Sequence, residues 1–280
     1  MAEASRAFQD LAATISGAVG RESALIRWAR PFYEWLLERV TGGRGYLRCV
    51  NGLDFYYVDP KQRGYFPPVY EPPVYQFIRN RVKPGDVSLD IGAHVGVYAL
   101  GMAKWSAPDG RVIAFEPNPI VREVLADHVR RNGLSSRIEI VPHAVSDVVG
   151  TSTFQAADRE GFSRLSTPNP ERPEVHSSLE VRTTTIDAFC NAAGITPDWI
   201  MMDIEGYEGS AILGGIETIR AGAGRLTLIV EMHPPLWEIS GSSRAAMEEI
   251  LAHAHLRAVP LSGQADPLGE MGVVLLETVS

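Results

Sequence analysis

The sequence predicts an α/β fold of the Rossmann-like type, with helices on both faces of a mostly parallel sheet. From residue 87 onward, short apolar runs alternate with longer helical patterns. Strands separated by helices of this length pair in parallel. The first apolar run, 87–91, carries an acid, Asp90, near its end and leads into a glycine turn at 92–96. The next run, 111–115, is followed by a second acid, Glu116. Such a pair of strand ends is typical of a nucleoside-binding crevice at the carboxyl edge of a sheet.

The pattern after residue 87 places each element of the main domain. Apolar runs predict the strands, and amphipathic segments with capping residues predict the helices. We expect strands at 87–91, 111–115, 138–142, 198–203 and 226–232, and helices at 95–105, 118–132, 185–193, 208–220 and 243–254. The last β-rich segments, 256–261 and 272–279, are expected to close the sheet as an antiparallel hairpin.

The N-terminal part, residues 1–73, is expected to be a helical cap with a β-hairpin and a proline-rich loop, ahead of a main domain over 74–280. Residues 4–41 have helical periodicity, which Gly17, Gly20 and Pro31 are expected to break into two or three helices. The apolar stripe comprises Phe8, Leu11, Ile15, Val19, Leu25, Trp28, Phe32, Trp35, Leu36 and Val40. This stripe predicts packing on the main domain or on a partner chain, and the second arrangement would give a homo-oligomer. Contact with a membrane surface is the alternative.

Three further segments complete the organisation. Asn51-Gly52 between β-rich runs predicts a hairpin over 46–58 with a two-residue turn. The proline-rich loop 59–73 leads into a helix at 74–82. The polar segment 148–184 is an insertion between the third and fourth core strands. It is either a lid over the acceptor or a β-hairpin without a substrate role.

Composition excludes several classes of protein. The chain has 280 residues, with 34 acidic against 26 basic residues and a net charge of −8, which argues against a nucleic-acid partner. Two cysteines make neither a disulfide framework nor a zinc cluster. We find no secretory signal and no apolar run long enough to span a membrane, and so expect a cytoplasmic protein.

Asp90, at the end of the first core strand, distinguishes between nucleoside ligands. A dinucleotide fingerprint has glycine here, because a pyrophosphate approaches the backbone. A carboxylate repels pyrophosphate but suits a cationic amino-acid tail, while Glu116 is placed to accept hydrogen bonds from ribose hydroxyls. S-adenosylmethionine carries both groups. The rivals are a nicotinamide-dependent oxidoreductase and a nucleoside-binding module without catalysis.

Five motifs occur in a fixed order: Asp90-Ile-Gly-Ala-His-Val-Gly96, Phe115-Glu-Pro-Asn118, His143-Ala-Val-Ser-Asp147, Asp203-Ile-Glu-Gly-Tyr-Glu208 and Val230-Glu-Met-His-Pro234. Together they resemble the FkbM-type family of S-adenosylmethionine-dependent methyltransferases, over roughly residues 70–235. The resemblance implies a class I methyltransferase fold with a seven-stranded sheet, and methyl transfer to a hydroxyl of a sugar, polyketide or other secondary metabolite. His94 stands where the family often has Asn, and Met201 where many members have Lys.

The donor site is expected to be formed by residues at or just after the ends of the first four core strands and by one acid before them. These are Asp90, Gly92, Ala93, His94, Gly96, Glu116, Pro117, Asn118, His143, Ala144, Asp203 and Glu71. Several have alternative structural roles. Asp90 and Asn118 are also candidate helix caps, while His94 is also a candidate packed turn residue and His143 a structural histidine.

The catalytic group is expected to be Asp203, Glu205, Glu231 and His233, which follow two apolar strands and alternate along the chain. His233, Glu231 or Glu205 is the candidate base for the acceptor proton. In the alternative, Asp203, Glu231 and His233 bind Mg²⁺ or Mn²⁺, which would lower the pKa of the hydroxyl. In a third interpretation the carboxylates cap helices and bind the donor's amine. We expect metal independence, and acceptor contacts from the N-terminal cap, the proline loop and the insertion.

Overall fold

The computed structural model describes residues 23–157, 164–165 and 176–279, together with the single residues 9, 12 and 14. The chain forms two compact units, one of residues 1–70 with 126–134 and one of residues 71–125 with 135–280. Helix α5 (Pro119–Arg131) runs from the second unit into the first. Among the described helices, none combines the length and the apolar character needed to cross a membrane.

The first unit contains helix α2 (Ala24–Val40), the hairpin of β1 (Tyr46–Val50) and β2 (Asp54–Val58), and the short helix η1 (Arg63–Tyr65). The predicted hairpin is confirmed, although Leu53 belongs to the turn and not to the second strand. Asn51 and Gly52 have φ values of 52° and 69°, the left-handed conformation that this dipeptide adopts readily.

The predicted break at Pro31 is wrong, because α2 continues through it. A proline removes one hydrogen bond of the helix, and a helix of 17 residues retains the others. Among the described side chains of α2, Leu37 is buried, whereas Trp28, Phe32 and Trp35 of the expected stripe are exposed. Phe8, Leu11, Ile15 and Val19, like Gly17 and Gly20, lie outside the described residues.

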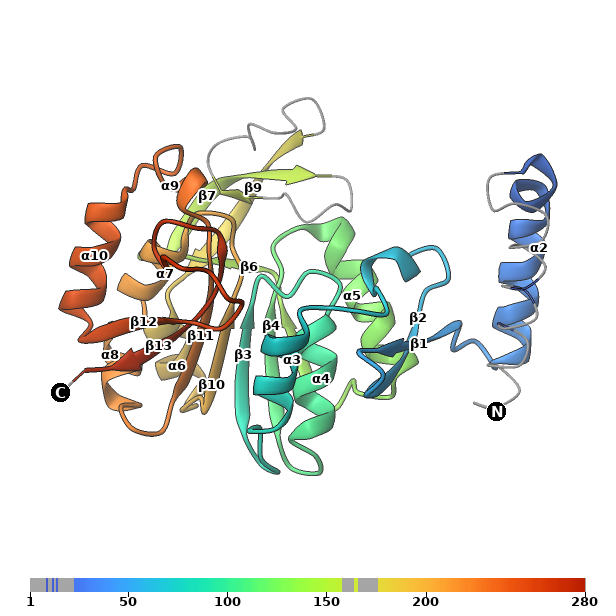
Figure 1. Cartoon of the computed structure of the whole chain (residues 1–280), viewed down its shortest axis with the longest axis horizontal. Helices are drawn as coiled ribbons and strands as arrows, with labels where there is room; N and C mark the ends of the chain where they lie inside the picture. The colour runs from blue at the N-terminus through green and yellow to red at the C-terminus, as the bar shows by residue number, and fades with distance from the viewer. Residues whose placement is uncertain are drawn as a thin grey trace. The chain divides into compact units, whose positions relative to one another are not determined.

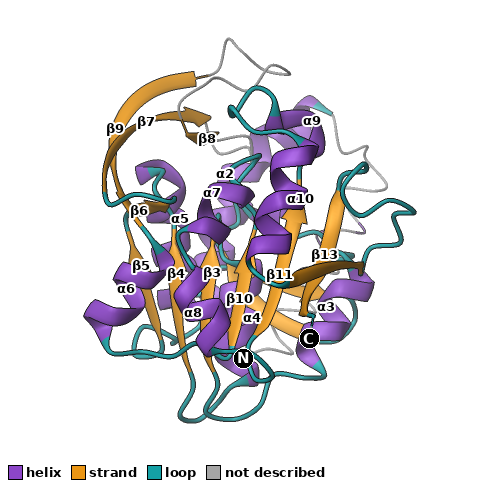
Figure 2. Cartoon of the chain, turned by 90° about the vertical axis from the view of Figure 1, so that its left-hand side faces the viewer, coloured by secondary structure: helices purple, strands orange, loops and turns teal. Residues whose placement is uncertain are grey.

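The described part of the second unit is built on a sheet of seven strands (Figure 2) in the order β12-β13-β11-β10-β3-β4-β5. The strands are β3 (Val87–Ile91), β4 (Arg111–Phe115), β5 (Ile138–Val141), β10 (Trp199–Met202), β11 (Thr227–Met232), β12 (Leu256–Pro260) and β13 (Gly272–Thr278). β13 runs antiparallel to both of its neighbours, and the other pairs are parallel. The predicted strands and the closing hairpin are therefore confirmed.

Helices cover both faces of this sheet (Figure 1). On one side lie α3 (Pro72–Arg79) and α4 (Val97–Trp105), and on the other α6 (Ile186–Ala193), α7 (Glu208–Leu213), α8 (Ile216–Ala221) and α10 (Arg244–His253). A further short helix, α9 (Pro234–Trp237), follows β11 and was not predicted. The α3 helix starts at Pro72, earlier than expected, with prolines at its first positions, where proline is well tolerated.

The helix predicted over 208–220 is wrong as a single element, because it is divided between α7 and α8 at Gly214-Gly215. A Cβ on Gly214 would lie 2.2 Å from the carbonyl oxygen of Ser146, and one on Gly215 would lie 2.9 Å from Cδ1 of Ile186. The chain therefore turns where its backbone packs directly against neighbouring elements.

Successive side chains of β3 point to opposite faces of the sheet, so the residues that enter the apolar core alternate with the one that faces the candidate site. Leu89 and Ile91 join the main apolar core with residues of α6, α7, α8 and α10. By the alternation of a strand, Asp90 lies on the opposite face, and the backbone of Ala99 in α4 hydrogen-bonds to it. A buried acid therefore stands at the carboxyl end of the central strand, on the α4 side.

The insertion, together with the short strand before it, forms a second sheet in the order β6-β9-β7-β8. Its strands are β6 (His143–Val145), which precedes the insertion, and β7 (Gly150–Ala157), β8 (Arg164–Leu165) and β9 (His176–Thr184). β7 and β9 form a long antiparallel hairpin, so this segment has the β-hairpin structure considered from the sequence. Its small apolar core includes Phe154 and Val181, and Tyr207, next to α7, packs against it. A role in covering the acceptor stays a prediction.

Candidate active site at the carboxyl edge of the sheet

The candidate site lies where the order of the strands reverses. β3 is flanked by β4 on one side and β10 on the other, so the loops after these strands diverge at one edge. The amide of Asp203 donates to the carbonyl oxygen of Ile91 at 2.9 Å, and the amides of Gly92 and Ala93 donate to the carbonyl oxygen of Phe115 at 3.1 and 3.0 Å. Open α/β sheets bind ligands at this position.

The glycine turn after β3 is shaped by contacts with the chain itself. Gly92 has a φ of +84°, and a Cβ there would lie 1.8 Å from the carbonyl oxygen of Asp203. Gly96 has a φ of +93°, and a Cβ there would lie 2.5 Å from Cδ1 of Leu125. We expected these glycines to admit a ligand. The structure shows that each already admits another element of the protein, while contact with the donor stays a prediction.

Asp90 is 4% exposed, and its Oδ2 has no hydrogen-bond partner among the described residues. Burial, reinforced by the negative charge of Asp203, raises the pKa of Asp90 to about 7. A buried carboxylate oxygen without a donor is unfavourable in the protein alone. It fits the ammonium group of an amino-acid tail, which supplies both a charge and hydrogen-bond donors.

Glu116 is also buried, and both of its oxygens are in use. Oε1 accepts from the amide of Asn118 at 2.8 Å, and Oε2 accepts from the amide of His94 at 2.9 Å. Because a carboxylate has about four acceptor positions, capacity remains for two ribose hydroxyls. Burial raises the pKa of Glu116 to about 7, against the lowering effect of these two amides.

Three further residues of the expected donor site, Asn118, His94 and Pro117, lie in the turns after β3 and β4. Asn118 caps α5, since its Oδ1 accepts from the amide of Ile120 at 3.0 Å, which supports the capping role left open above. His94 adopts a φ of 48° within the glycine turn. The carbonyl oxygen of Pro117 accepts from Nη1 of Arg122.

Two predicted donor residues lie in the small sheet. Ala144 is buried in its apolar core, next to His143, whose Nδ1 is buried without a hydrogen-bond partner among the described residues. Burial, with the nearby charge of Arg182, lowers the pKa of His143. Glu71, at the start of α3, accepts from the hydroxyl of Tyr98 at 2.5 Å. Burial raises the pKa of Glu71, and the charge of Asp203 raises it further.

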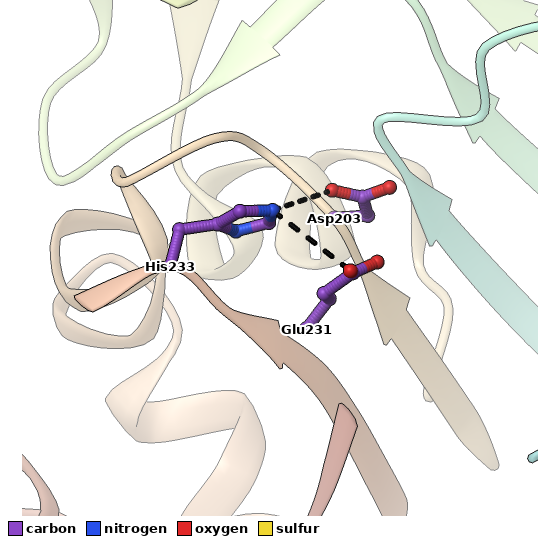
Figure 3. Close-up of side chains that lie close together, drawn as sticks. All are labelled: Asp203, Glu231 and His233. Atoms are coloured by element: carbon purple, nitrogen blue, oxygen red, sulfur yellow. Dashed lines mark ion pairs between the residues drawn. The ribbon is translucent and has the colours of Figure 1, made fainter. Parts of the chain in front are cut away.

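The expected catalytic side chains converge around the ring of His233 (Figure 3). Its Nε2 lies 3.7 Å from Asp203 Oδ1, 3.9 Å from Glu205 Oε2 and 4.0 Å from Glu231 Oε1. Asp203 follows β10, whereas Glu231 and His233 come from the end of β11. Asp203, Glu231 and His233 each offer a donor atom within 4.8 Å of the other two, so these residues could hold a divalent cation.

Glu208 is the residue that the sequence analysis missed. It is buried at the first position of α7, and its Oε1 lies 2.8 Å from Nδ1 of His233. It stands in the motif that ends at Glu208, and that motif was the available signal. Although burial lowers it, the hydrogen bond and charge of Glu208, with the charges of Asp203 and Glu205, raise the pKa of His233 to about 10.

The carboxylates also act on one another. Burial and the charge of Asp203 raise the pKa of Glu231 to about 8. Burial raises the pKa of Asp203 too, although the imidazolium of His233 opposes this. The site thus concentrates negative charge around one imidazole, and it is suited to bind cationic groups and to exchange protons near neutral pH.

These features define an α/β protein with a Rossmann-like sheet and a cluster of acids around one histidine at its switch point. Residues 90–258 match the Methyltransferase FkbM domain family. The chain belongs to this family.

Individual proteins are similar over parts of the chain. The 2-O-methyltransferase NoeI of Sinorhizobium fredii (strain NBRC 101917 / NGR234) is 31% identical over 152 residues, covering 49% of this chain and 60% of the relative. The ribosomal protein L11 methyltransferase of Pelotomaculum thermopropionicum is 32% identical over 66 residues, covering 24% and 21%. The crystal structure of the methyltransferase FkbM from Methylobacillus flagellatus KT is 19% identical, covers 70% of this chain and 44% of that one, and has a TM-score of 0.46. The chain therefore spans 60% or less of the curated relatives it matches.

Proposed function

We propose that this protein transfers a methyl group from S-adenosylmethionine to a hydroxyl oxygen of a small molecule or glycan. The position of Asp203 supports this most directly. Its charge acts on the pKa values of Asp90 and Glu116, the expected donor-binding acids, and its Oδ1 lies 3.7 Å from the ring of His233. Donor binding and proton transfer thus share one group of charges.

S-adenosylmethionine supplies an electrophilic methyl group on a positively charged sulfur. Asp90 binds the ammonium group, and Glu116 accepts hydrogen bonds from the ribose. The acceptor oxygen bonds to the methyl carbon, the electron pair of the broken carbon–sulfur bond stays on sulfur, and the hydroxyl proton passes to Nε2 of His233. Positioning of this kind contributes on the order of 7–11 kcal/mol.

The protonation of His233 sets a condition on this mechanism. With a pKa of about 10, the ring carries its proton at neutral pH in the protein alone and accepts no other. The proposal therefore requires that positive charge brought by the donor lowers this pKa. Glu231 is the second candidate base, because its own pKa of about 8 lies near neutrality and its Oε1 is 4.0 Å from the same nitrogen.

Several finer assignments belong to this proposal. NoeI is named as a 2-O-methyltransferase, which supports transfer to oxygen and a sugar among the candidate acceptors. Polyketides and other secondary metabolites are further candidates, with acceptor contacts from the N-terminal cap, the proline loop and the 148–184 insertion. We propose that the protein acts in the cytoplasm without a nucleic-acid partner, as a homo-oligomer through its N-terminal helices, and without a required metal.

The experiment is a comparison of variants with an acceptor identified from a panel of sugar and polyketide hydroxyls. His233→Ala is expected to keep donor affinity and to lose about 10²–10⁴-fold in kcat, with Glu205→Ala less damaged. Greater damage in Glu205→Ala or Glu231→Gln would assign the base to a carboxylate. A His233→Ala enzyme within about threefold of wild type would rule out the histidine. Donor binding without transfer to any hydroxyl in the panel would favour a nucleoside-binding module.

A further inference from the structure

The side chain of Glu208 is 0% exposed and lies between the loop after β10 and the loop after β11. Three nitrogen atoms converge on it. Its Oε1 accepts from the amide of Gly206 at 2.7 Å and lies 2.8 Å from Nδ1 of His233, while its Oε2 accepts from Nε1 of Trp237 at 2.9 Å. Backbone amides and indoles can only donate. Each oxygen therefore accepts a hydrogen bond, and an ionised Glu208 requires a proton on Nδ1 of the ring.

An acid in the first turn of a helix has an ordinary explanation, since it opposes the helix dipole. That explanation does not account for Glu208. Its hydrogen bonds reach back to Gly206, before α7, and across to His233 and Trp237, which are 25 and 29 positions further along the chain. Burying a carboxylate is unfavourable unless donors surround it. The site satisfies this one with groups from two separate loops.

The contact through Nδ1 determines which way the imidazole faces. With this nitrogen tied to Glu208, the other ring nitrogen, Nε2, points at Asp203 and Glu231 (Figure 3). Rotation of the ring by half a turn would break the bond to a buried charge. A hydrogen bond on one imidazole nitrogen also sets which tautomer the ring adopts when it is neutral.

The same carboxylate holds the loop that carries Glu205. Gly206 donates to Glu208 and has a φ of +97°, and Glu205 before it has a φ of 53°. Non-glycine residues adopt this left-handed conformation when their surroundings impose it. A Cβ on Gly206 would lie 2.9 Å from Cβ of Leu236, so this turn packs against α9.

We propose that Glu208 is the positioning residue of this site: it orients His233 so that Nε2 faces the acceptor, and it contacts neither donor nor acceptor itself. This inference rests on the proposed function where it gives His233 a role at the acceptor hydroxyl. The orientation of the ring can be tested without turnover.

The test uses Glu208→Gln, which keeps the shape and removes the charge, in the full chain. Trp237→Phe is the matched control, because it removes the bond to Oε2 and leaves the bond between Oε1 and His233. Glu208→Gln is expected to lose about 10²-fold or more in kcat, as when the orienting acid of a catalytic imidazole is neutralised. Its donor Kd and acceptor KM should stay within about threefold of wild type, while Trp237→Phe should keep most of its kcat.

Nuclear magnetic resonance of ¹⁵N-histidine-labelled protein gives the readout that a merely structural role would not change. The wild type should show a protected Nδ1 proton on His233, identified by its loss in His233→Ala. This signal should persist in Trp237→Phe and be lost in Glu208→Gln. If Glu208→Gln does not fold, the wild-type spectrum still decides, because an unprotonated Nδ1 would overturn the proposal.

Two kinetic outcomes would also overturn the proposal. One is a folded Glu208→Gln enzyme whose kcat is within about threefold of the wild-type value, and the other is a folded Trp237→Phe enzyme that loses as much kcat as Glu208→Gln does. Failure of the proposed function would be distinguishable from failure of this proposal about Glu208. In that case the wild type transfers no methyl group to a hydroxyl, and the Nδ1 signal alone decides whether Glu208 orients the ring.

Discussion

Gly92, in the loop after β3, packs against the loop after β10, and its replacement by alanine tests how closely these two loops must pack. The added Cβ would lie 1.8 Å from the carbonyl oxygen of Asp203, whereas Cβ atoms essentially never come within 3.0 Å of another heavy atom. The two loops must therefore separate by about 1.2 Å, the difference between these distances. Asp203 is part of the cluster around His233, so this displacement reaches the proposed catalytic group.

Gly85 provides the control for this substitution. Its φ is +92°, close to the +84° of Gly92, and nothing lies within 4 Å of the position of its Cβ. Gly85→Ala therefore carries the cost of a left-handed alanine alone, roughly 1–3 kcal/mol. Gly92→Ala should be less stable than this control by a further 1–3 kcal/mol or so, the usual cost of overpacking. A shift of about 1 Å at a reacting group can cost on the order of 10²-fold in rate, and we expect a loss of that size in kcat.

Urea unfolding curves give the stability difference, and calorimetry with S-adenosylmethionine separates donor binding from turnover. Equal unfolding free energies for Gly92→Ala and Gly85→Ala would refute the close contact with Asp203. A destabilised Gly92→Ala variant with wild-type kcat would show that the position of Asp203 does not matter to catalysis.

Three further predictions concern the donor, pH and metal. Glu116→Ala should weaken S-adenosylmethionine binding by about 1.5–3 kcal/mol by calorimetry, and unchanged affinity in a folded variant would contradict the ribose assignment. The pKa values of Asp90 and Glu116, raised to about 7, lie above those of the unfolded chain. The stability that these two groups contribute is fully present below their pKa values in the unfolded chain and is lost as pH rises through 7, so thermal melts should show a falling melting temperature over this range. Affinity for the cationic donor should rise over the same range, and affinity that falls from pH 6 to 8 would contradict this. Turnover should survive exhaustive chelation, whereas loss restored by Mg²⁺ or Mn²⁺ would assign a cation to Asp203, Glu231 and His233.

The fold was largely predictable because buried parallel strands form continuous apolar runs in the sequence. β3 and β4 lie at the predicted residues, 87–91 and 111–115. The predictions that were wrong depend on the surroundings of a segment and not on its own pattern. The division between α7 and α8 follows from the approach of Gly214 to Ser146, and two residues so far apart in the chain give no local signal.

The site was predictable where topology alone brings residues together. β10 and β11 are parallel neighbours, so Asp203 and Glu231 had to end at the same edge, with His233 two positions further on. Glu208 was not predictable in the same way. Its place in the first turn of a helix suggests a surface acid, and its burial depends on His233 and Trp237, which approach only in the folded chain.

On the proposed function, the charge in this site would link binding of the donor to activation of the base. Asp90, Glu116 and Glu231 all have raised pKa values, because burial and the charge of Asp203 disfavour their ionised forms. Against the lowering effect of burial, the hydrogen bond and charge of Glu208, with the charges of Asp203 and Glu205, raise the pKa of His233 to about 10, which keeps the ring protonated. A ligand that carries an ammonium and a sulfonium favours ionised acids and disfavours a protonated imidazole beside them. On the proposed function, His233 therefore becomes a base when the donor is bound. The pKa of the base in the pH profile of kcat, which reports the bound enzyme, should then lie below that in the profile of kcat/KM for the donor, which reports the free enzyme; equal values in the two profiles would contradict this.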